Sequence, residues 1–161
     1  MCDSLMVIAA NNTPIYQGNK IIIKHDNNCI KHLGFKKEAN ELELSFCAYS
    51  SLDVMDEKIM ETRDIFLGTL YENETHRVYG YCPSSRMKFL ALYKTSNQIV
   101  ENQVRDFLYF RDSFIVLKVK TKLKTLHTNY IKASANPFYQ HGTILSTPSF
   151  VAASEELMSQ D

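Results

Sequence analysis

The chain has 161 residues, of which 45% are hydrophobic and 22% are charged, so it suits a single folded domain and none of the disordered, coiled-coil or collagen-like classes. Its 18 basic and 18 acidic residues cancel, which disfavours non-specific binding to nucleic acid or to anionic lipid. Four cysteines without a paired pattern are typical of free thiols in a reducing compartment, and the short apolar run at residues 5–10 favours neither secretion nor membrane insertion.

The first elements that the sequence predicts form a hairpin. Residues 5–10 are typical of a buried strand, and Asn11-Asn12-Thr13-Pro14 is a turn signal that leads into a second short run at Ile15-Tyr16. Residues 18–37 follow and are polar and irregular, apart from one apolar run at residues 21–23. This segment is typical of a loop.

One cluster inside that loop has a spacing like that of metal ligands. His25, Cys29 and His32 offer the imidazole and thiolate groups that zinc favours. They supply only three ligands, whereas structural zinc sites have four, and no second cluster supplies another. A solvated loop is therefore favoured over a metal site, and we expect neither a metal nor a cofactor.

A helix is expected to begin at Ser50-Ser51-Leu52-Asp53, which has the spacing of a capping box. Its apolar residues recur at intervals of three and four and are Leu52, Met55 and Ile59. Its other side is charged and carries Asp53, Asp56, Glu57, Lys58 and Glu61. We expect Met55 and Ile59 to pack under a sheet, and the acidic side to face water or a partner rather than to act as an acid and base pair.

Three runs with the length and composition of strands come next, at residues 65–71, 76–82 and 87–93. Polar turns separate them at residues 72–75 and 83–86. The middle run alternates, which sets Tyr79 and Tyr81 on the face opposite Val78. The sequence therefore predicts a three-stranded antiparallel meander.

Beyond the meander the sequence predicts helices with an interruption. Ser96 and Asn97 are candidate caps for a helix that begins near Gln98. Residues 107–119 are too densely apolar for one face of a surface helix, which leaves three interpretations open: a partner surface, an extended helix, or sequence read through from an unspliced intron. Residues 123–130 fit a further helix.

Four lysines alternate with less polar residues near the end of the apolar stretch, at positions Lys118, Lys120, Lys122 and Lys124. In an extended segment their ammonium groups would align along one side. Such a row could bind phosphate lipids or nucleic acid, or it could be a solvated face or a sheet edge protected by charge. The zero net charge favours the second interpretation.

Several stretches, in their order along the chain, resemble the sedlin family. They are Pro14-Ile15-Tyr16, Ser51-Leu52-Asp53-Val54-Met55-Asp56-Glu57-Lys58, Leu67-Gly68-Thr69-Leu70-Tyr71, Val78-Tyr79-Gly80-Tyr81, Asn136-Pro137-Phe138-Tyr139 and Ile144-Leu145-Ser146-Thr147-Pro148-Ser149-Phe150. The resemblance covers most of the chain and has gaps at residues 18–37 and 107–120. It implies one domain over residues 1–161, with both gaps as insertions that lie outside the core sheet.

The predicted elements give an α+β fold with a five-stranded antiparallel sheet. The resemblance implies the longin-like, or profilin-like, form of this fold. The first hairpin then lies beside the last strand of the meander, which gives the strand order 2-1-5-4-3. One helix covers one face of the sheet, and the C-terminal helices cover the other.

The resemblance also implies a function. The chain would be a non-catalytic small subunit of the transport protein particle (TRAPP) complex, a scaffold or adaptor in traffic between endoplasmic reticulum and Golgi and through the Golgi. Its partners would be other small and large subunits and, indirectly, a Rab GTPase, with no nucleic acid. It would be cytoplasmic and perinuclear, and peripheral at both membranes only through the complex.

The sequence contains no catalytic motif that would indicate an enzyme instead. The chain has five glycines but no phosphate-binding loop, no Gly-x-Ser-x-Gly motif and no cysteine or histidine dyad, so we expect no enzyme. An alternative function on the same fold is a regulatory longin domain of SNARE or coat-adaptor type. The SNARE form is disfavoured because no heptad repeat or membrane anchor follows Phe150 in this sequence.

Asn136-Pro137-Phe138-Tyr139 also matches the Asn-Pro-x-Tyr motif that phosphotyrosine-binding domains recognise in exposed turns. The family keeps this tetrapeptide in its folded core. The resemblance therefore favours a structural turn that ends the preceding helix, with Phe138 and Tyr139 packed back on the domain.

The predicted functional residues are a partner-binding set, Tyr49, Asp53, Asp56 and Glu57. The three acids form a negative edge beside Tyr49, and charge of this kind sets the orientation and rate of association. In the family, the matching run of residues lies where neighbouring subunits are contacted. We expect Asp53 to stand in the first turn of its helix and to serve this interface rather than folding alone.

Overall fold

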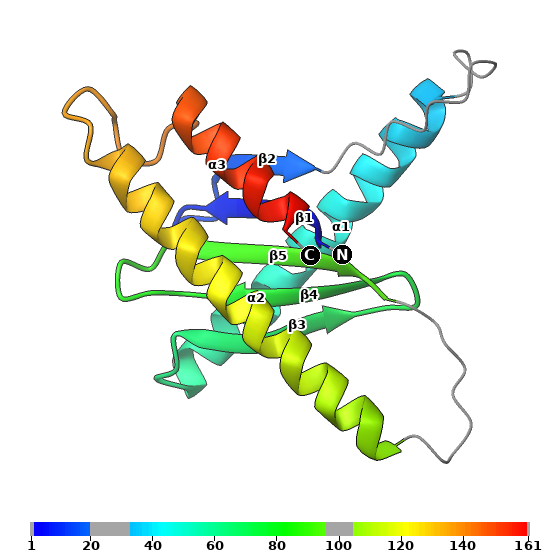
Figure 1. Cartoon of the computed structure of the whole chain (residues 1–161). Coiled ribbons are helices and arrows are strands. Elements are labelled where there is room, and N and C mark those ends of the chain that lie inside the picture. Colours follow the sequence, from blue (N-terminus) through cyan, green and yellow to red (C-terminus); the bar gives the residue numbers. More distant parts are fainter. Residues whose placement is uncertain (1, 20–32, 96–104, 161) are drawn as a thin grey trace.

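The computed structural model describes residues 2–19, 33–95 and 105–160. Its elements in chain order are β1 (Cys2–Ile8), β2 (Pro14–Asn19), α1 (Leu33–Glu61), β3 (Phe66–Glu72), β4 (His76–Tyr81), β5 (Lys88–Lys94), α2 (Arg105–Ser134) and α3 (Pro148–Ser159). The strands of this part of the chain form one antiparallel sheet in the order β2-β1-β5-β4-β3. Helix α1 covers one face, and α2 and α3 cover the other (Figure 1). The predicted α+β architecture and its strand order are confirmed.

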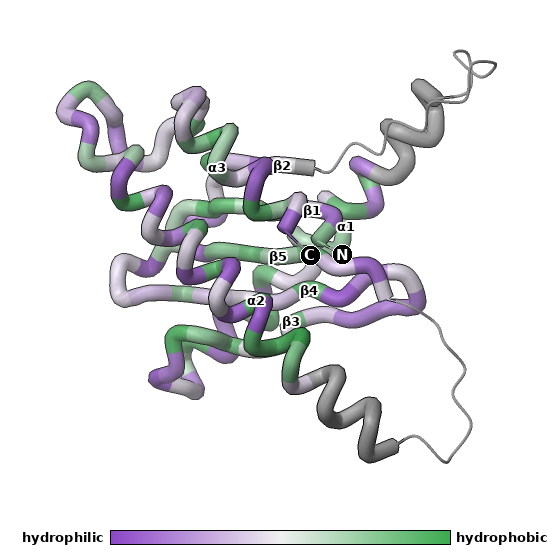
Figure 2. Tube along the Cα trace, in the orientation of Figure 1, coloured by the Kyte–Doolittle hydropathy of each residue, from purple (hydrophilic) through white to green (hydrophobic). Residues whose placement is uncertain are grey.

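Strands β1 and β5 are interior strands, and hydrophobic residues concentrate along them (Figure 2). Leu5 lies opposite Ala91, and both belong to the core beneath α2 and α3. Met6 lies opposite Leu90, and both belong to the core beneath α1. Because both faces of these strands are covered, their middle positions are apolar, which explains the unbroken apolar runs at residues 5–8 and 89–93.

The two cores contain the residues that the sequence assigned to them. Tyr79 and Tyr81 lie in the core under α2 and α3, whereas Val78 lies in the core under α1, as the alternation predicted. Met55 is fully buried under the sheet, and Ile59 packs against the same core from a partly buried position. The predicted contacts of both residues are confirmed.

Helix α1 begins far earlier than expected, at Leu33 rather than at Ser50. The capping-box prediction is wrong, because the buried hydroxyl of Ser51 donates a hydrogen bond of 2.7 Å to the carbonyl of Ala48 within the helix. Leu44, Cys47 and Ala48 continue the buried row toward the N-terminus, so packing on the sheet outweighs the local cap signal. It follows that Asp53 lies in the middle of the helix and not in its first turn.

The segment 18–37 is not wholly an insertion outside the sheet, which corrects the expectation. Gly18 belongs to β2, where it is paired with Leu5 and its carbonyl accepts a 3.0 Å hydrogen bond from the Ser4 hydroxyl. A Cβ atom at Gly18 would lie too close to the Tyr16 hydroxyl, so the absence of a side chain leaves room for that ring. Residues 33–37 are the first turns of α1. Residues 20–32, which include the predicted metal candidates His25, Cys29 and His32, lie outside the described residues.

The apolar segment 107–120 lies entirely within α2, so the extended helix is the interpretation that the structure supports. The segment lies on a helix and not in the sheet, and Val119 is fully buried in the core between that helix and the sheet. Phe114 and Leu117 are exposed instead, and they explain why the segment was too apolar for one face. No helix among the described residues combines the length and the apolar composition that crossing a membrane requires. The helix expected near Gln98 lies outside the described residues.

The four lysines of this region do not line up, because they are spaced on a helix and not on an extended segment. Lys122 turns toward the sheet and is buried. Its ammonium group donates a 3.2 Å hydrogen bond to the carbonyl of Gln160 and lies 5.7 Å from the centre of the Tyr93 ring. Lys118, Lys120 and Lys124 are exposed. The segment is therefore not a sheet edge, and these three lysines form the solvated face that the same interpretation allowed.

The loop from α2 to α3 holds the Asn-Pro-x-Tyr motif as a structural turn, as predicted. The side-chain oxygen of Asn136 accepts a 3.0 Å hydrogen bond from the amide of Phe138, and the Tyr139 hydroxyl donates one of 2.9 Å to the carbonyl of Thr143. Tyr139 packs against the core, but Phe138 is 92% exposed, which corrects its predicted packing. After the loop, Phe150 of α3 packs edge-to-face on Tyr16.

Candidate functional site

Helix α1 turns one side to the sheet and the other to solvent. Its sheet side is a row of buried residues at intervals of three and four, namely Leu44, Cys47, Ala48, Ser51, Leu52 and Met55. The opposite side carries large apolar side chains, among them Phe46, which is 64% exposed, and Met60. A surface helix normally keeps polar residues on its outer side, so this side of α1 is a candidate interface.

Three of the four predicted partner-binding residues lie on this outer side. Tyr49, Asp53 and Glu57 follow one another at intervals of four, and all three are exposed. On an α-helix, residues with this spacing lie one above the other on the same face. The structure therefore brings an aromatic ring and two carboxylates together in one row.

The fourth predicted residue, Asp56, has a different role. Its carboxylate forms an ion pair of 2.5 Å with the ammonium group of Lys88, whose side chain is only 3% exposed. Lys88 also donates a 2.6 Å hydrogen bond to the side-chain oxygen of Asn12. Because a buried ammonium group needs a partner, Asp56 serves to compensate Lys88 as well as to contribute negative charge to the surface.

Sequence reasoning missed the apolar part of this surface. Leu42, Phe46 and Met60 are exposed and continue the row of Tyr49, Asp53 and Glu57 at intervals of three and four. We call these six residues the α1 stripe. Leu42 and Phe46 were missed because the helix was expected to begin at Ser50. Extending the same periodicity toward the N-terminus is the signal that would have found them.

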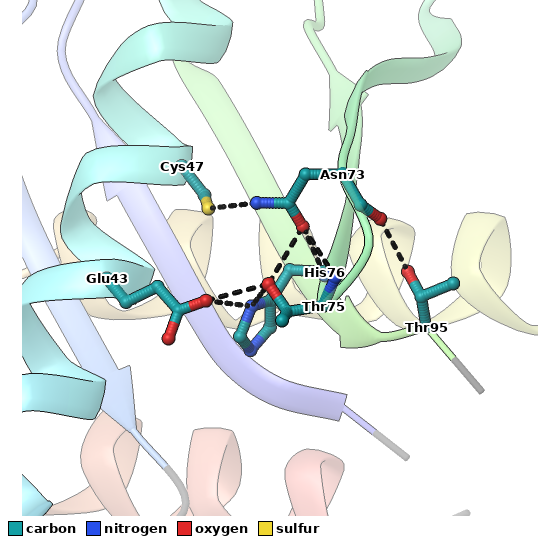
Figure 3. A network of polar contacts seen from close by, with 6 residues as sticks. All are labelled: Glu43, Cys47, Asn73, Thr75, His76 and Thr95. Carbon is teal, nitrogen blue, oxygen red and sulfur yellow. Dashed lines mark hydrogen bonds and ion pairs between the residues drawn. The ribbon is translucent and has the colours of Figure 1, made fainter. Parts of the chain in front are cut away.

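Polar contacts of Glu43 and Cys47 fix the corresponding part of α1 on the sheet (Figure 3). The Thr75 hydroxyl donates a 2.7 Å hydrogen bond to the carboxylate of Glu43, and Nδ1 of His76 lies 3.4 Å from the same carboxylate. The turn that carries these groups is fixed by Asn73, whose side-chain oxygen accepts from the His76 amide at 2.5 Å. The side-chain amide of Asn73 in turn donates to the sulfur of Cys47 at 3.6 Å.

At the other end of the helix, Lys58 provides the anchor. Its ammonium group donates hydrogen bonds of 3.3 and 2.7 Å to the carbonyls of Leu67 and Thr69 on the edge strand β3. Between the two ends, the Gln17 side chain donates a 3.1 Å hydrogen bond to Ser45. The part of α1 from Glu43 to Lys58 is therefore fixed to the sheet, which suits a preorganised docking surface.

The network around His76 combines a carboxylate, an imidazole and a hydroxyl, but its geometry does not suit catalysis. A catalytic relay needs the carboxylate and the hydroxyl at different ring nitrogens, whereas Glu43 and Thr75 both approach Nδ1 of His76. Burial, with a further contribution from Glu43, raises the pKa of the Cys47 thiol, which therefore stays protonated. Among the described residues, no group of three or more histidine, cysteine or acidic side chains could hold a metal ion.

Charge is distributed unevenly on α1. Residues 41–61 contain six acidic residues and one lysine. Glu43 and Asp56 are engaged with the sheet, while Asp53 and Glu57 stand on the exposed side between Tyr49 and Met60. The arrangement of aromatic and apolar anchors with acidic neighbours fits a protein partner that carries an apolar groove with basic residues at its rim.

Comparisons with known proteins identify the family to which this fold belongs. A family model described as Sedlin matches residues 7–160. A protein of cattle (Bos taurus) named trafficking protein particle complex subunit 2-like protein is 30% identical over 128 residues, which cover 75% of this chain and 82% of that protein. A protein of the same name in Xenopus tropicalis is 31% identical over 118 residues, which cover 69% of this chain and 75% of that protein. A protein of the same name in Dictyostelium discoideum is 26% identical over 118 residues, which cover 71% of this chain and 74% of that protein.

Proposed function

The chain belongs to the sedlin family, and from this membership we propose that it is a non-catalytic small subunit of a trafficking protein particle complex. The observation that carries the proposal is the match of the family model over residues 7–160, together with relatives whose names describe subunits of such a complex. These names favour the complex over the alternative of a regulatory longin domain of SNARE or coat-adaptor type.

The role within the complex is that of a scaffold or adaptor. The α1 stripe supports it, because a row of exposed apolar side chains on a firmly held helix is suited to binding a neighbouring subunit. Phe46 and Tyr49 are the aromatic anchors, since aromatic side chains dominate the energetics of protein interfaces. Asp53 and Glu57 orient the approach of a basic partner.

The proposed setting is vesicle-mediated transport between the endoplasmic reticulum and the Golgi and through the Golgi. The chain would act on a Rab GTPase only indirectly, through the assembled complex. Its location would be cytoplasmic and perinuclear, with peripheral attachment to both membranes through the complex. The large accessory subunits are the partners that we assign to the α1 stripe.

Affinity purification followed by mass spectrometry tests both parts of the proposal. The tagged wild-type chain is expected to recover small and large subunits of the trafficking complex. The double variant Phe46→Ser and Tyr49→Ser is expected to lose the large subunits while keeping its fold, because both side chains are exposed. Phe138→Ser is a matched control, since Phe138 is an exposed aromatic residue away from α1.

Each part of the proposal has its own contrary result. Recovery of no trafficking subunit by the wild-type chain would contradict membership of the complex. Full recovery by the double variant would leave membership intact and would show that the α1 stripe is not the docking surface. An equal loss with Phe138→Ser would also contradict the assignment to α1.

A further inference from the structure

The charges that cancel over the whole chain are separated in space. Residues 41–61 of α1 contain six acidic residues and one lysine, whereas residues 113–134 of α2 contain five lysines and no acidic residue. The two helices lie on opposite faces of the sheet (Figure 1). The zero net charge therefore conceals a basic side of α2, and it does not exclude binding of this helix to an anionic surface.

The outer side of α2 is also unusually apolar. Phe114 and Leu117 are 58% and 61% exposed, and Ile131 is exposed near the other end of the helix. Figure 2 shows hydrophobic residues at the start of the part of α2 that it colours. The helical spacing places these three residues on the side of α2 away from the sheet. Thr121, Thr125 and Thr128 lie on the same side.

The three threonines of this outer side add little polarity to it. The hydroxyls of Thr121, Thr125 and Thr128 each donate a 3.0 Å hydrogen bond to a helix carbonyl, those of Leu117, Thr121 and Lys124. Their donor protons are thus already used within the helix. The outer side of α2 is therefore a continuous ridge from Phe114 to Ile131, with short side chains in its middle.

Exposed lysines accompany this ridge along its whole length. They are Lys118, Lys120, Lys124 and Lys132. The ammonium group of Lys118 lies 4.9 Å from the centre of the Phe114 ring, so charge and apolar surface occur side by side. Lysine stems can cover apolar surface while the ammonium group reaches a polar boundary, which is the behaviour of lysines at lipid interfaces. Lys122 is not among them, because it is engaged with Gln160.

We propose that the outer side of α2 binds directly to the surface of an anionic phospholipid bilayer. The lysines would pair with lipid phosphates, while Phe114 and Leu117 would enter the headgroup region. Charge complementarity favours this occupant, because the lysine ammonium groups along the ridge match the negative phosphates of lipids, and the short threonines offer no anchor for the groove of a protein. This contact goes beyond the proposed function, in which membrane attachment comes only through the complex.

Sedimentation with lipid vesicles tests the proposal on the purified full-length chain. The chain is expected to sediment with vesicles of phosphatidylcholine and phosphatidylserine, but not with vesicles of phosphatidylcholine alone. Added salt should release it, because the attraction is electrostatic. Each lysine near the surface should strengthen binding by about fivefold, so K118Q, K124Q and K132Q together should weaken it by roughly a hundredfold.

A matched control separates the face of α2 from the overall charge. The triple variant R63Q, R86Q and K94Q also removes three positive charges, but from exposed positions outside α2. It should bind to the vesicles nearly as the wild type does. A second pair, F114S with L117S, tests the apolar part of the ridge and should also weaken binding. Thermal melts of each variant confirm that the fold is kept, since every substituted residue is exposed.

Three results would overturn the proposal. The first is a wild-type chain that does not bind vesicles with phosphatidylserine. The second is an equal loss of binding in the two triple-charge variants, which would point to net charge alone. The third is salt-sensitive self-association, or binding to an acidic protein, that depends on the α2 lysines without any binding to vesicles. Because the assay contains the purified chain and no other subunit, none of the three results depends on whether the chain belongs to a trafficking complex.

Discussion

At the scale of single residues, Lys88 explains why one acid of the predicted set differs from the others. Its buried ammonium group is compensated by Asp56 at 2.5 Å and by Asn12 at 2.6 Å. Asp53 and Glu57 are exposed on the same helix, and the structure assigns neither of them the compensation of a buried cation. From the sequence alone the three acids looked equivalent, because the partner of Asp56 lies on a distant strand.

We therefore expect Asp56→Asn to destabilise the fold by about 1–3 kcal/mol, since it leaves a buried cation without its charged partner. The half-exposed position of Asp56 keeps the loss below that of a fully buried ion pair. Urea denaturation measures the difference. A loss no larger than that of Glu57→Gln, the adjacent acid on the exposed side, would contradict this role of Asp56.

Asp53 is expected to act on binding and not on stability. Because it lies in mid-helix and is exposed, Asp53→Asn and Asp53→Tyr should both unfold within about 1 kcal/mol of wild type. The tyrosine variant should nevertheless fail to co-purify with the large accessory subunits, since its bulk lies in the α1 stripe. Urea melts and co-purification are the two measurements. Normal assembly of the tyrosine variant, or its unfolding, would refute the interface role.

At the scale of elements, the strands could be predicted and the helix limits could not. Turn signals such as Asn11-Asn12-Thr13-Pro14 are local, and the structure has β1 and β2 on either side of them. Helix α1 extends beyond Ser50 toward the N-terminus, where Leu44 and Cys47 are buried against the sheet, and the prediction followed the local cap signal at Ser50 instead of this periodicity. Likewise α2 was not recognised over residues 107–119, because its outer side is apolar at Phe114 and Leu117.

The packing of α1 under the sheet can be tested with two methionines of the same helix. Met55 is fully buried, so Met55→Ala should cost about 2–5 kcal/mol through lost burial and the cavity left behind. Met60 is exposed, and Met60→Ala should change stability by less than about 0.5 kcal/mol. Urea melts compare the two variants. Similar small losses at both positions would contradict the placement of α1.

The continuity of α2 through residues 107–120 can be tested in the same way. Val119→Ala should destabilise the fold by about 1–3 kcal/mol, because the side chain is fully buried beside Leu123 and Leu126. Leu117→Ala, two residues earlier and on the exposed side, should have little effect. Thermal or urea unfolding is the measurement. If Val119→Ala were as harmless as Leu117→Ala, the segment would not belong to the core.

At the scale of the whole molecule, the sheet separates two different surfaces. Its α1 face carries an apolar stripe with acidic neighbours, and its α2 face carries an apolar ridge with lysines. Family and fold could be predicted from short motifs along the chain, since these encode turns and the buried pattern. The separation of acidic and basic residues could not be predicted from the sequence, because it depends on which face of the sheet each helix covers.

Contact between the α1 stripe and another subunit of a trafficking complex can be tested by site-specific photo-crosslinking. A photoreactive phenylalanine analogue is placed at Tyr49 and, as a control, at Phe138, both of which are exposed. We expect the probe at Tyr49 to form a covalent product with a large trafficking subunit in cells, and the probe at Phe138 to form none. A Tyr49 probe that forms no product with any subunit of the complex would contradict this contact.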